Sequence, residues 1–390
     1  MLVLTDTQKA IVETVRDFVE NEVVPVADEM EHRDEFPETI VEKMKELGLF
    51  GLTVPEEYGG IGESLTTYAL TVVELARGWM SLSGILNTHF MGCYLINKFG
   101  TDEQREKFLP KMSTGEWRAA LAMSEPEAGS DVQSIRTKAI PDGDDYIVNG
   151  QKMWLTNGLR SSIVMTLVKT DPDADPPHKG MSMLIVEKEG GNPNPAPGLD
   201  VGKNIEKMGY KGVETTEMTF SDYRIPRSNL LGTDEGQGFR QVLDGIEIGR
   251  VNVAARAVGL ATRAFEEAIR YSQERKAFGV PISKHQAIQI HLAEMATTLE
   301  AARLMLYSAA QKKSAGERSD LEASMAKLFA SEACHEICTK ALRVHGGYGY
   351  SKEFTIERLY RDAPFLLIGE GTSEIQKTVI ARRLLEKFKI

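Results

Sequence analysis

The sequence predicts a mainly helical protein with an inserted β-domain, and three observations predict this fold class. Capped helical segments fill the first third of the chain, short strand-like runs separated by turn residues follow, and long helical segments occupy the rest. A chain of 390 residues exceeds the size at which a single core usually stops growing. We therefore expect an N-terminal α-helical domain over residues 1–117, a middle β-domain over 118–230 and a C-terminal four-helix bundle over 231–390.

Capping signals predict the N-terminal helices. Thr5 and Gln8 have the spacing of a capping box, and apolar residues then recur with a helical period. Thr101 and Gln104 repeat this signal before a short helix that we expect to reach Pro110. The first region is therefore predicted to be helical throughout.

The middle region has a different period. Turn dipeptides stand at 142–143 and 149–150, and β-rich runs follow at 161–169 and 181–186. Residues 215–220 alternate between apolar and polar side chains. This pattern is typical of a small β-domain.

Long helical segments dominate the C-terminal region. One is predicted over about 237–274 and another over about 321–344, and Ser283 with Gln286 has capping-box spacing at the start of a third. Helices of this length favour a bundle.

Composition excludes several classes of function. The 46 basic and 57 acidic residues give a formal charge of −11, whereas nucleic-acid binding requires concentrated Lys and Arg, so we expect no nucleic-acid partner. No apolar run approaches the roughly 20 residues that span a bilayer. The first residues show neither a signal-peptide nor a transit-peptide pattern. We expect a protein without a membrane span that stays where it is made, in a bacterial cytoplasm.

Cysteine usage does not predict a metal site. Cys334 and Cys338 flank His335 on a predicted helix, but no second pair of ligands accompanies them. We interpret both as buried helical thiols and expect no metal.

The common nucleotide and hydrolase motifs are absent from the sequence. It contains no GxGxxG after a strand, no GxxxxGK[ST], no HExxH and no GxSxG. A nucleotide cofactor, if present, must therefore be bound without these signatures.

Three segments break local rules that a plain bundle would obey. The first, 124–131, is rich in small and polar residues and is either an interdomain turn or an anion site. The second, 345–350, has more glycines than a helix C-cap needs, so it is either a sharp bend or a close approach of backbone to a ligand.

The third segment, 369–376, places Glu370 between Gly369 and Gly371. Ser373 and Gln376 have capping-box spacing, so a helix is expected to begin directly after this loop. Desolvation by a ligand would raise the carboxyl pKa toward that of a useful base, and the helix dipole would oppose the rise. The alternative is a surface glutamate before a helix.

Taken together, these segments resemble the acyl-CoA dehydrogenase family. The resemblance runs in order through almost the whole chain, and no single motif carries it. The matching motifs are PEEYGG at 55–60, SEPEAGSD at 124–131, GQKMWLTNG at 150–158, ERKAFGVPISKHQ at 274–286, HGGYGYSKEF at 345–354, ERLYRDA at 357–363 and EGTSEIQ at 370–376.

The resemblance implies an FAD-dependent enzyme in which the cofactor lies between the β-domain and the bundle and touches two subunits. Arg275, Phe278 and Gln286 match positions that hold the ADP part from a neighbouring subunit. Together with these three, the implied cofactor-binding residues are Leu121, Ser124, Ser130, Trp154, Thr156, Arg343, Gly346, Gly347, Thr372 and Glu374.

The family chemistry is α,β-dehydrogenation of an acyl-CoA thioester to the trans-2-enoyl-CoA. Glu370 would take the α-proton, and the flavin N5 would accept hydride from Cβ. The implied substrate-binding residues are Ser130, Glu247, Arg250 and Gly371. The resemblance further implies a role in fatty acid metabolism, β-oxidation, a homotetramer built as a dimer of dimers, and an electron-transfer flavoprotein as electron acceptor.

The chain departs from the family pattern at three positions. Some branches carry the base at the position matching Gly249, and Glu247 points about 200° away around the helix, which leaves Glu370 as the candidate. Gly369 replaces a frequent tyrosine, and we hypothesise that this widens the acyl pocket. Arg343 replaces a frequent glutamine and either adds charge near the cofactor pyrophosphate or faces solvent.

Other functions on this fold stay open. An acyl-CoA oxidase would pass electrons to oxygen, although the compact length favours the dehydrogenase. A nitroalkane oxidase would use aspartate as its base. A non-catalytic scaffold would be expected to lose the base or the cofactor contacts.

Overall fold

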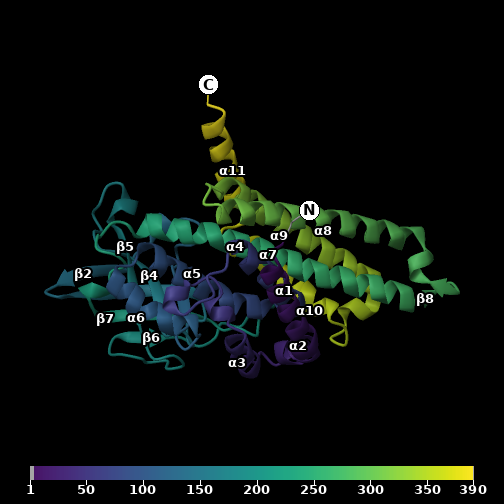
Figure 1. Cartoon of the computed structure of the whole chain (residues 1–390), viewed down its shortest axis with the longest axis horizontal. Coiled ribbons are helices and arrows are strands. Elements are labelled where there is room, and N and C mark those ends of the chain that lie inside the picture. The colour runs from purple at the N-terminus through teal and green to yellow at the C-terminus, as the bar shows by residue number, and fades with distance from the viewer. Residues whose placement is uncertain (1–3, 390) are drawn as a thin grey trace.

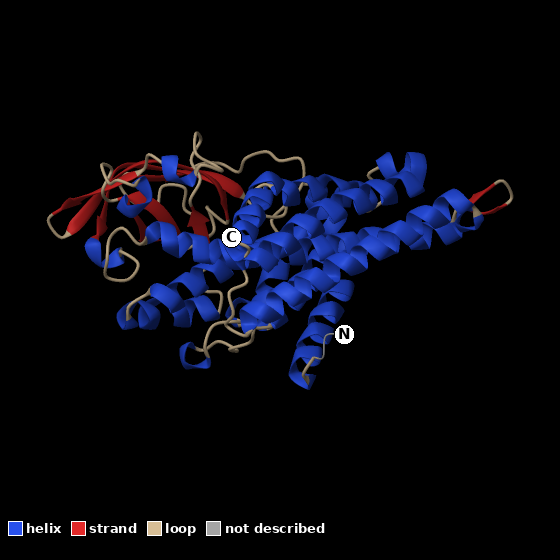
Figure 2. Cartoon of the chain, turned by 90° about the horizontal axis from the view of Figure 1, so that it is seen from above, coloured by secondary structure: helices blue, strands red, loops and turns tan. Residues whose placement is uncertain are grey.

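The computed structural model describes residues 4–389 and shows a β-domain at one end of a long helical body. N-terminal helices pack beside the body, and the strands gather at one end of it (Figures 1 and 2). The predicted fold class is confirmed, while the exact domain boundaries stay a prediction.

The N-terminal helices begin where the capping signals place them. Thr5 and Thr101 each accept a hydrogen bond from the backbone three residues on, and the glutamines complete both capping boxes. The last of these N-terminal helices passes through Pro110, where it was predicted to end, and continues for three more residues. These helices are α1 (Asp6–Phe18), α2 (Val24–His32), α3 (Glu38–Glu46), α4 (Leu65–Gly78), α5 (Met80–Phe99) and α6 (Asp102–Ser113).

The β-domain is a seven-stranded sheet in the order β1-β4-β2-β3-β7-β6, with β5 paired to β4. The apolar runs in β4 and β5 are buried along almost their whole length, as their composition predicts. The strands are β1 (Ala119–Ala122), β2 (Lys138–Asp142), β3 (Asp145–Thr156), β4 (Ile163–Lys169), β5 (Met181–Glu187), β6 (Leu199–Val201) and β7 (Thr215–Pro226).

The C-terminal body is organised around α7, which packs against α4, α5, α8, α9 and α10. A short hairpin of β8 and β9 joins α7 to α8 at the end of the body opposite the β-domain (Figure 1). These elements are α7 (Gly238–Glu274), β8 (Lys276–Ala277), β9 (Val280–Pro281), α8 (Gln286–Ser314), α9 (Asp320–His345), α10 (Ile356–Ile368) and α11 (Ser373–Lys387).

Two predicted helix caps are wrong. Ser283 lies in a 3₁₀ turn, and the residue that precedes α8 is His285, without a side-chain cap. Helix α11 is capped by Thr372, whose hydroxyl accepts the Ile375 N–H, rather than by Ser373. In both cases the spacing correctly predicted that a helix begins nearby. The capping residue itself was wrong, because the extended backbone that a cap requires falls on another residue.

The two cysteines of α9 are buried, as predicted. Across residues 4–389, no helix is long and apolar enough to cross a membrane.

A buried glutamate joins the three regions. Glu31, on α2, accepts hydrogen bonds from the Trp79 indole at 2.8 Å and from the backbone N–H groups of Lys211 and Gly212 at 3.0 and 3.3 Å. Arg361 of α10 stands 3.7 Å from the same carboxylate. One side chain therefore accepts hydrogen bonds from the helical region and the β-domain and forms an ion pair with the bundle.

We predict that Glu31→Ala lowers the free energy of unfolding by about 3 kcal/mol, because it leaves several buried donors without an acceptor. Urea unfolding followed by circular dichroism measures the change. The exposed Glu29 on the same helix gives the control: Glu29→Ala should change stability by less than about 0.5 kcal/mol. Equal effects of the two substitutions would contradict the role of Glu31.

Candidate active site

Glu370 lies in the short loop between α10 and α11, and its side chain turns into the protein. Its Oε1 accepts a hydrogen bond from the Asn87 amide of α5, and its Oε2 is buried without a partner in the described chain. The residue as a whole is half-buried, so the loop surface is open while the carboxylate is enclosed. The alternative, a surface glutamate with a solvent-exposed carboxylate, is thereby excluded.

Glycine at position 249 makes room for this carboxylate. A Cβ built on Gly249 would lie 1.6 Å from Oε2 of Glu370 and 3.3 Å from the Met91 sulfur. A helix-interior glycine is less favourable than alanine by up to about 1 kcal/mol, so its presence here needs a packing reason. The observed position of Glu370 and any side chain at 249 exclude one another.

The loop that carries Glu370 has a strained backbone, and a lysine side chain binds to it. Glu370 and Gly371 adopt φ values of 54° and 92°, in the left-handed region. Lys327 of α9 donates a hydrogen bond to the Gly371 carbonyl at 2.8 Å, and the Gln376 amide donates to the same carbonyl at 3.0 Å. Backbone strain of this kind persists only where the surroundings fix it, and it concentrates at functional sites.

Burial raises the pKa of the Glu370 carboxyl above its usual value. Arg256, the Asn87 hydrogen bond, Lys327 and Arg250 oppose the rise, in that order. Burial also lowers the pKa of Lys327 to about 8, although Glu370 acts in the opposite direction. The Glu370 carboxylate therefore binds a proton more tightly than a surface glutamate does.

Two backbone donors stand next to this carboxylate. The N–H groups of Glu370 and Gly371 make no hydrogen bond to any other residue within 4–389. They are therefore free to donate to a ligand oxygen at the same loop.

Glu247 and Arg250 lie on α7 close to the start of α9. Glu247 accepts a hydrogen bond from the Ser319 hydroxyl at 2.8 Å and forms an ion pair with Lys313 at 3.1 Å, so it is engaged away from Glu370. Arg250 donates to the Ser324 hydroxyl at 3.3 Å, while its Nε is buried without a partner in the described residues. The predicted substrate residues of α7 thus come together, whereas Ser130 is exposed on the separate 124–131 turn.

Four of the residues that the resemblance implies as cofactor-binding gather in the β-domain. Leu121 lies in β1, and Ser124 accepts the Met153 N–H through its backbone carbonyl at 2.9 Å, which joins the two segments. Trp154 sits at an irregularity of the β3–β7 pairing, has φ of 67° and exposes 56% of its surface. Thr156 follows at the end of β3. An indole held outward by a strained backbone is suited to packing against a planar ligand.

The residues predicted to hold the ADP part lie at the other end of the molecule. Phe278, at the tip of the β8–β9 hairpin, is 95% exposed with φ of 53°, and Arg275 stacks over the Tyr348 ring at 5.6 Å. Figure 1 shows this hairpin far from the β-domain. The structure does not bring the two predicted cofactor sets together within one chain, which fits their assignment to neighbouring subunits. The remaining predicted members are Gln286, at the first residue of α8, exposed Arg343, exposed Gly346 and Gly347 after α9, and Thr372 and Glu374 at the start of α11.

Gly369 does not simply leave space in the pocket. A Cβ at this position would lie 2.8 Å from the Phe365 ring, so the ring occupies the room beside the loop. Phe365 in turn stacks on Tyr210 with ring centroids 4.7 Å apart. Because the Phe365 ring fills this space, the lack of a side chain at position 369 does not by itself widen the acyl pocket.

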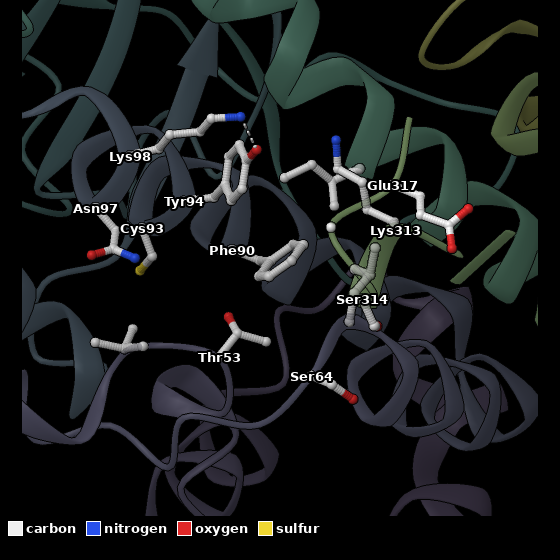
Figure 3. Close-up of a pocket in the computed structure, with 14 residues that line it drawn as sticks. Thr53, Ser64, Phe90, Cys93, Tyr94, Asn97, Lys98, Lys313, Ser314 and Glu317 are labelled. Atoms are coloured by element: carbon white, nitrogen blue, oxygen red, sulfur yellow. Dashed lines mark hydrogen bonds between the residues drawn. The ribbon is translucent and has the colours of Figure 1, made fainter. Parts of the chain in front are cut away.

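A cavity of about 360 Å³ lies between α5, α7 and the segment after α8, and it contains no predicted site residue. Phe90 stands at its centre, with Tyr94 and Lys98 on one side and Lys313 and Glu317 on the other (Figure 3). Phe90 also stacks on Tyr68 at 3.9 Å. Glu370 is not among the residues that line this cavity.

The sequence analysis missed Asn87, Lys327 and Arg256, all of which act on Glu370. Each is a polar side chain inside an apolar helical stretch and is buried in the structure. Buried polar residues of this kind usually have a specific partner, so the interruption of an apolar run was the available signal. The partner itself, more than 40 residues away in each case, could not be read from the chain.

Comparisons with known proteins identify the family of this chain. The acyl-CoA dehydrogenase N-terminal, middle and C-terminal domain families match residues 5–116, 120–223 and 236–385. The chain is 41% identical over 383 residues to an acyl-CoA dehydrogenase of Bacillus subtilis (strain 168), which covers 98% of this chain and 99% of that protein.

Two further proteins are similar over almost the full length. The Caffeyl-CoA reductase-Etf complex subunit CarC of Acetobacterium woodii is 39% identical over 391 residues, covering 98% of this chain and 99% of its own. The structure of butyryl-CoA dehydrogenase from Megasphaera elsdenii matches with a TM-score of 0.94 at 35% identity, covering 99% of this chain and 100% of that chain.

We predict that Gly249→Ala expels the Glu370 carboxylate from its present position, because the added methyl group would overlap Oε2. A crystal structure of the variant would show the displaced side chain and a broken Asn87 contact. The control is Gly245→Ala, one turn earlier on α7, where an added Cβ meets only the flexible Leu95 side chain at 3.3 Å. An unmoved Glu370 in Gly249→Ala would contradict the packing described here.

Proposed function

The chain belongs to the acyl-CoA dehydrogenase family and is an FAD-dependent oxidoreductase, and we propose that it converts an acyl-CoA thioester to the trans-2-enoyl-CoA with Glu370 as the base. The observation that carries the proposal is the buried carboxylate of Glu370, enclosed between Asn87 and Gly249 on a strained loop. No other carboxylate among the predicted site residues is placed in this way.

A base for an α-proton must be deprotonated at rest and yet bind the proton during the reaction. Burial raises the pKa of Glu370, which strengthens its affinity for the proton. The nearby cations and the Asn87 amide limit this rise, so the carboxylate stays ionised at rest. An aliphatic acyl chain that displaces water from the loop would raise the pKa further. The site thus balances the two requirements by means of partners from α5, α7 and α9.

The thioester oxygen gains negative charge as the α-proton leaves. The unpaired N–H groups of Glu370 and Gly371 support stabilisation of this charge, since backbone donors that are already oriented act like an oxyanion hole. Lys327 and Gln376 fix the Gly371 peptide through its carbonyl, so these donors are held in place. We assign Gly371 to substrate binding on this basis.

The residues present fit an FAD cofactor. Gly346 adopts φ of 60°, which itself favours glycine, whereas Gly347 has no such φ and an added Cβ there would meet nothing within residues 4–389. Neither backbone conformation nor packing among these residues accounts for Gly347, whereas close approach of a cofactor would. Bound FAD supplies the two-electron acceptor for the hydride that leaves Cβ. Trp154 and Thr156 would orient the ring, and Arg275, Phe278 and Gln286 would hold the ADP part for a neighbouring subunit.

The same residues serve the reverse reaction. One relative similar over its full length is named as a reductase, so reduction of an enoyl-CoA is the second candidate function. In that direction the protonated Glu370 would deliver a proton to Cα. The balance between the two directions depends on the electron partner rather than on the residues of this site.

We further propose that an electron-transfer flavoprotein is the electron partner and that the chain forms a homotetramer in the cytoplasm. The name of the Acetobacterium woodii relative, which includes an Etf complex, supports the first proposal. The separation of the two cofactor sets within one chain supports an assembly in which subunits share cofactors. A role in β-oxidation of fatty acids follows from the family chemistry.

The proposed function is tested by anaerobic titration of the flavin-containing protein with a panel of acyl-CoA thioesters. We expect loss of flavin absorbance with at least one thioester, and a decrease in its rate of at least about 10³-fold in Glu370→Gln, because the amide cannot accept the proton. A yellow protein that no acyl-CoA bleaches would overturn the proposal. Equal rates in the wild type and Glu370→Gln would overturn the assignment of the base.

The pH dependence of bleaching provides a second test. The rate depends on deprotonated Glu370, so it should fall as the pH drops through the pKa of this group, which is raised by burial. Asn87→Ala removes a hydrogen bond that lowers this pKa, so the half-maximal rate should move to higher pH by about one unit. The control is Asn97→Ala, on the same helix but facing the cavity. A profile that is unchanged in Asn87→Ala would contradict the role of this amide.

A further inference from the structure

Four polar side chains form a buried cluster next to Glu370, and the proposed chemistry uses only one of them, Arg256, through its charge. Arg256 donates to the Asn252 carbonyl oxygen at 2.6 Å and to the Tyr210 hydroxyl at 3.2 Å, and the Asn252 amide donates to the Tyr68 hydroxyl at 2.8 Å. At most 2% of any of these side chains is exposed. We call Tyr68, Tyr210, Asn252 and Arg256 the donor cluster.

The donor cluster lies one helical turn from the base. Gly249, which touches the Glu370 carboxylate, and Asn252 are three residues apart on α7 and therefore neighbours on its surface. Long side chains on a helix lean toward its N-terminus, and the hydrogen bond to Asn252 shows that the Arg256 guanidinium does so. The guanidinium therefore stands about 4.5 Å, slightly less than one turn, along the helix from the base.

Arg256 is a buried cation without an anion bound to it. It forms no ion pair with any carboxylate among residues 4–389, and its other neighbours are the faces of Tyr210 and Phe365, at 5.6 and 5.9 Å. Glu370 acts on it electrostatically, but no hydrogen bond joins the two. An unpaired buried charge is strongly unfavourable, so a site of this kind is expected to receive a counter-ion.

The hydrogen-bond inventory of the cluster shows a surplus of donors. The Tyr68 and Tyr210 oxygens both serve as acceptors, and the amide oxygen of Asn252 is already occupied by Arg256. The phenolic hydrogen of Tyr68 and the second guanidinium nitrogen, Nη2, have no acceptor in the described part of the chain. The cluster lacks a ligand that is negative and accepts several hydrogen bonds.

The fold is adapted to this arrangement at some energetic disadvantage. Tyr210 adopts φ of 58°, which is unusual for an aromatic residue, and its backbone N–H is fixed by the Asp362 carboxylate at 2.7 Å. A Cβ at Gly84 on α5 would lie 1.5 Å from the Tyr210 hydroxyl, so a helix-interior glycine makes room for it. Helix-interior glycine and strained aromatic backbone together point to a functional requirement at this hydroxyl.

We propose that the donor cluster binds a carboxylate at the distal end of a short acyl chain, so that the substrate is the CoA monothioester of a dicarboxylic acid. The inference rests on the proposed function, since Glu370 fixes the position of Cα. A guanidinium matches a carboxylate with two parallel hydrogen bonds, and Tyr68 supplies a third donor. The small separation between the base and the guanidinium along α7 selects a short chain.

A rival role for Arg256 is to act only through Glu370, by stabilising its charge. That role requires no ligand and predicts that all acyl-CoA thioesters are affected alike when Arg256 is replaced. It also gives no reason for the surplus donor of Tyr68 or for the glycine opposite Tyr210. The two roles therefore differ in their dependence on the acyl group.

The test compares succinyl-, glutaryl- and adipyl-CoA with butyryl-, pentanoyl- and hexanoyl-CoA. Flavin bleaching is measured in the wild type, and dissociation constants are measured calorimetrically in the flavin-containing Glu370→Gln protein, which binds without turnover. Each is repeated with Arg256→Met, with Tyr68→Phe, and with the control Arg303→Met, which removes a charge from α8 whose hydrogen bonds go to Glu300 and Thr262.

We expect the wild type to prefer the carboxylated thioester of the matching length, and Arg256→Met to reduce this preference roughly 10- to 100-fold. Tyr68→Phe should reduce it less, in the same direction, while retaining the stacking on Phe90, and Arg303→Met should leave it intact. Flavin content and circular dichroism confirm that the variants fold.

Three results would overturn the inference. The first is bleaching by uncharged thioesters at least as readily as by all carboxylated ones. The second is an equal loss for both kinds of thioester in Arg256→Met, which would support the rival role. The third is an unchanged binding preference in Arg256→Met and Tyr68→Phe. Failure of every thioester to bleach the flavin would instead overturn the proposed function.

Discussion

The structure depends on the burial of one carboxylate against a helix that has no side chain at the point of contact. Glu370 reaches α7 only because position 249 is glycine, and the 1.6 Å separation of the Cβ position from Oε2 leaves no tolerance. Asn87 holds the other oxygen, and Lys327 holds the next peptide through its carbonyl. Contacts from α5, α7 and α9 thus fix the strained loop, and a glutamate on the surface would not require them.

Helix α7 connects this loop with the rest of the molecule. Along its length it contributes the residues near the start of α9, the glycine beside the base, and the cluster around Arg256. It also packs against both the N-terminal helices and the bundle, so groups from distant parts of the sequence meet around one rigid element. Sites built on helices and strands hold their geometry better than sites built on loops alone, which explains how a loop residue can be positioned accurately here.

The sequence predicted the fold class, because helical period, capping boxes and turn dipeptides are local signals. It predicted Glu370 from its glycine neighbours and the family motif, and it predicted the two cofactor sets by resemblance alone. It misplaced the caps at Ser283 and Ser373, since the capping residue depends on backbone geometry that spacing does not fix. It could not identify Asn87, Lys327 or Arg256, because their role arises from contacts across helices. It also could not show that Phe365 fills the space beside Gly369.

The central claim is that Glu370 exchanges a proton with the α-carbon of a bound thioester. The most direct measurement is the incorporation of deuterium at Cα when the flavin-containing protein is incubated anaerobically in ²H₂O with an acyl-CoA that bleaches its flavin, followed by mass spectrometry of the recovered thioester. The account predicts incorporation with the wild type and none above background with Glu370→Gln. Incorporation at the wild-type rate in Glu370→Gln would show that another group removes the proton and would contradict the account.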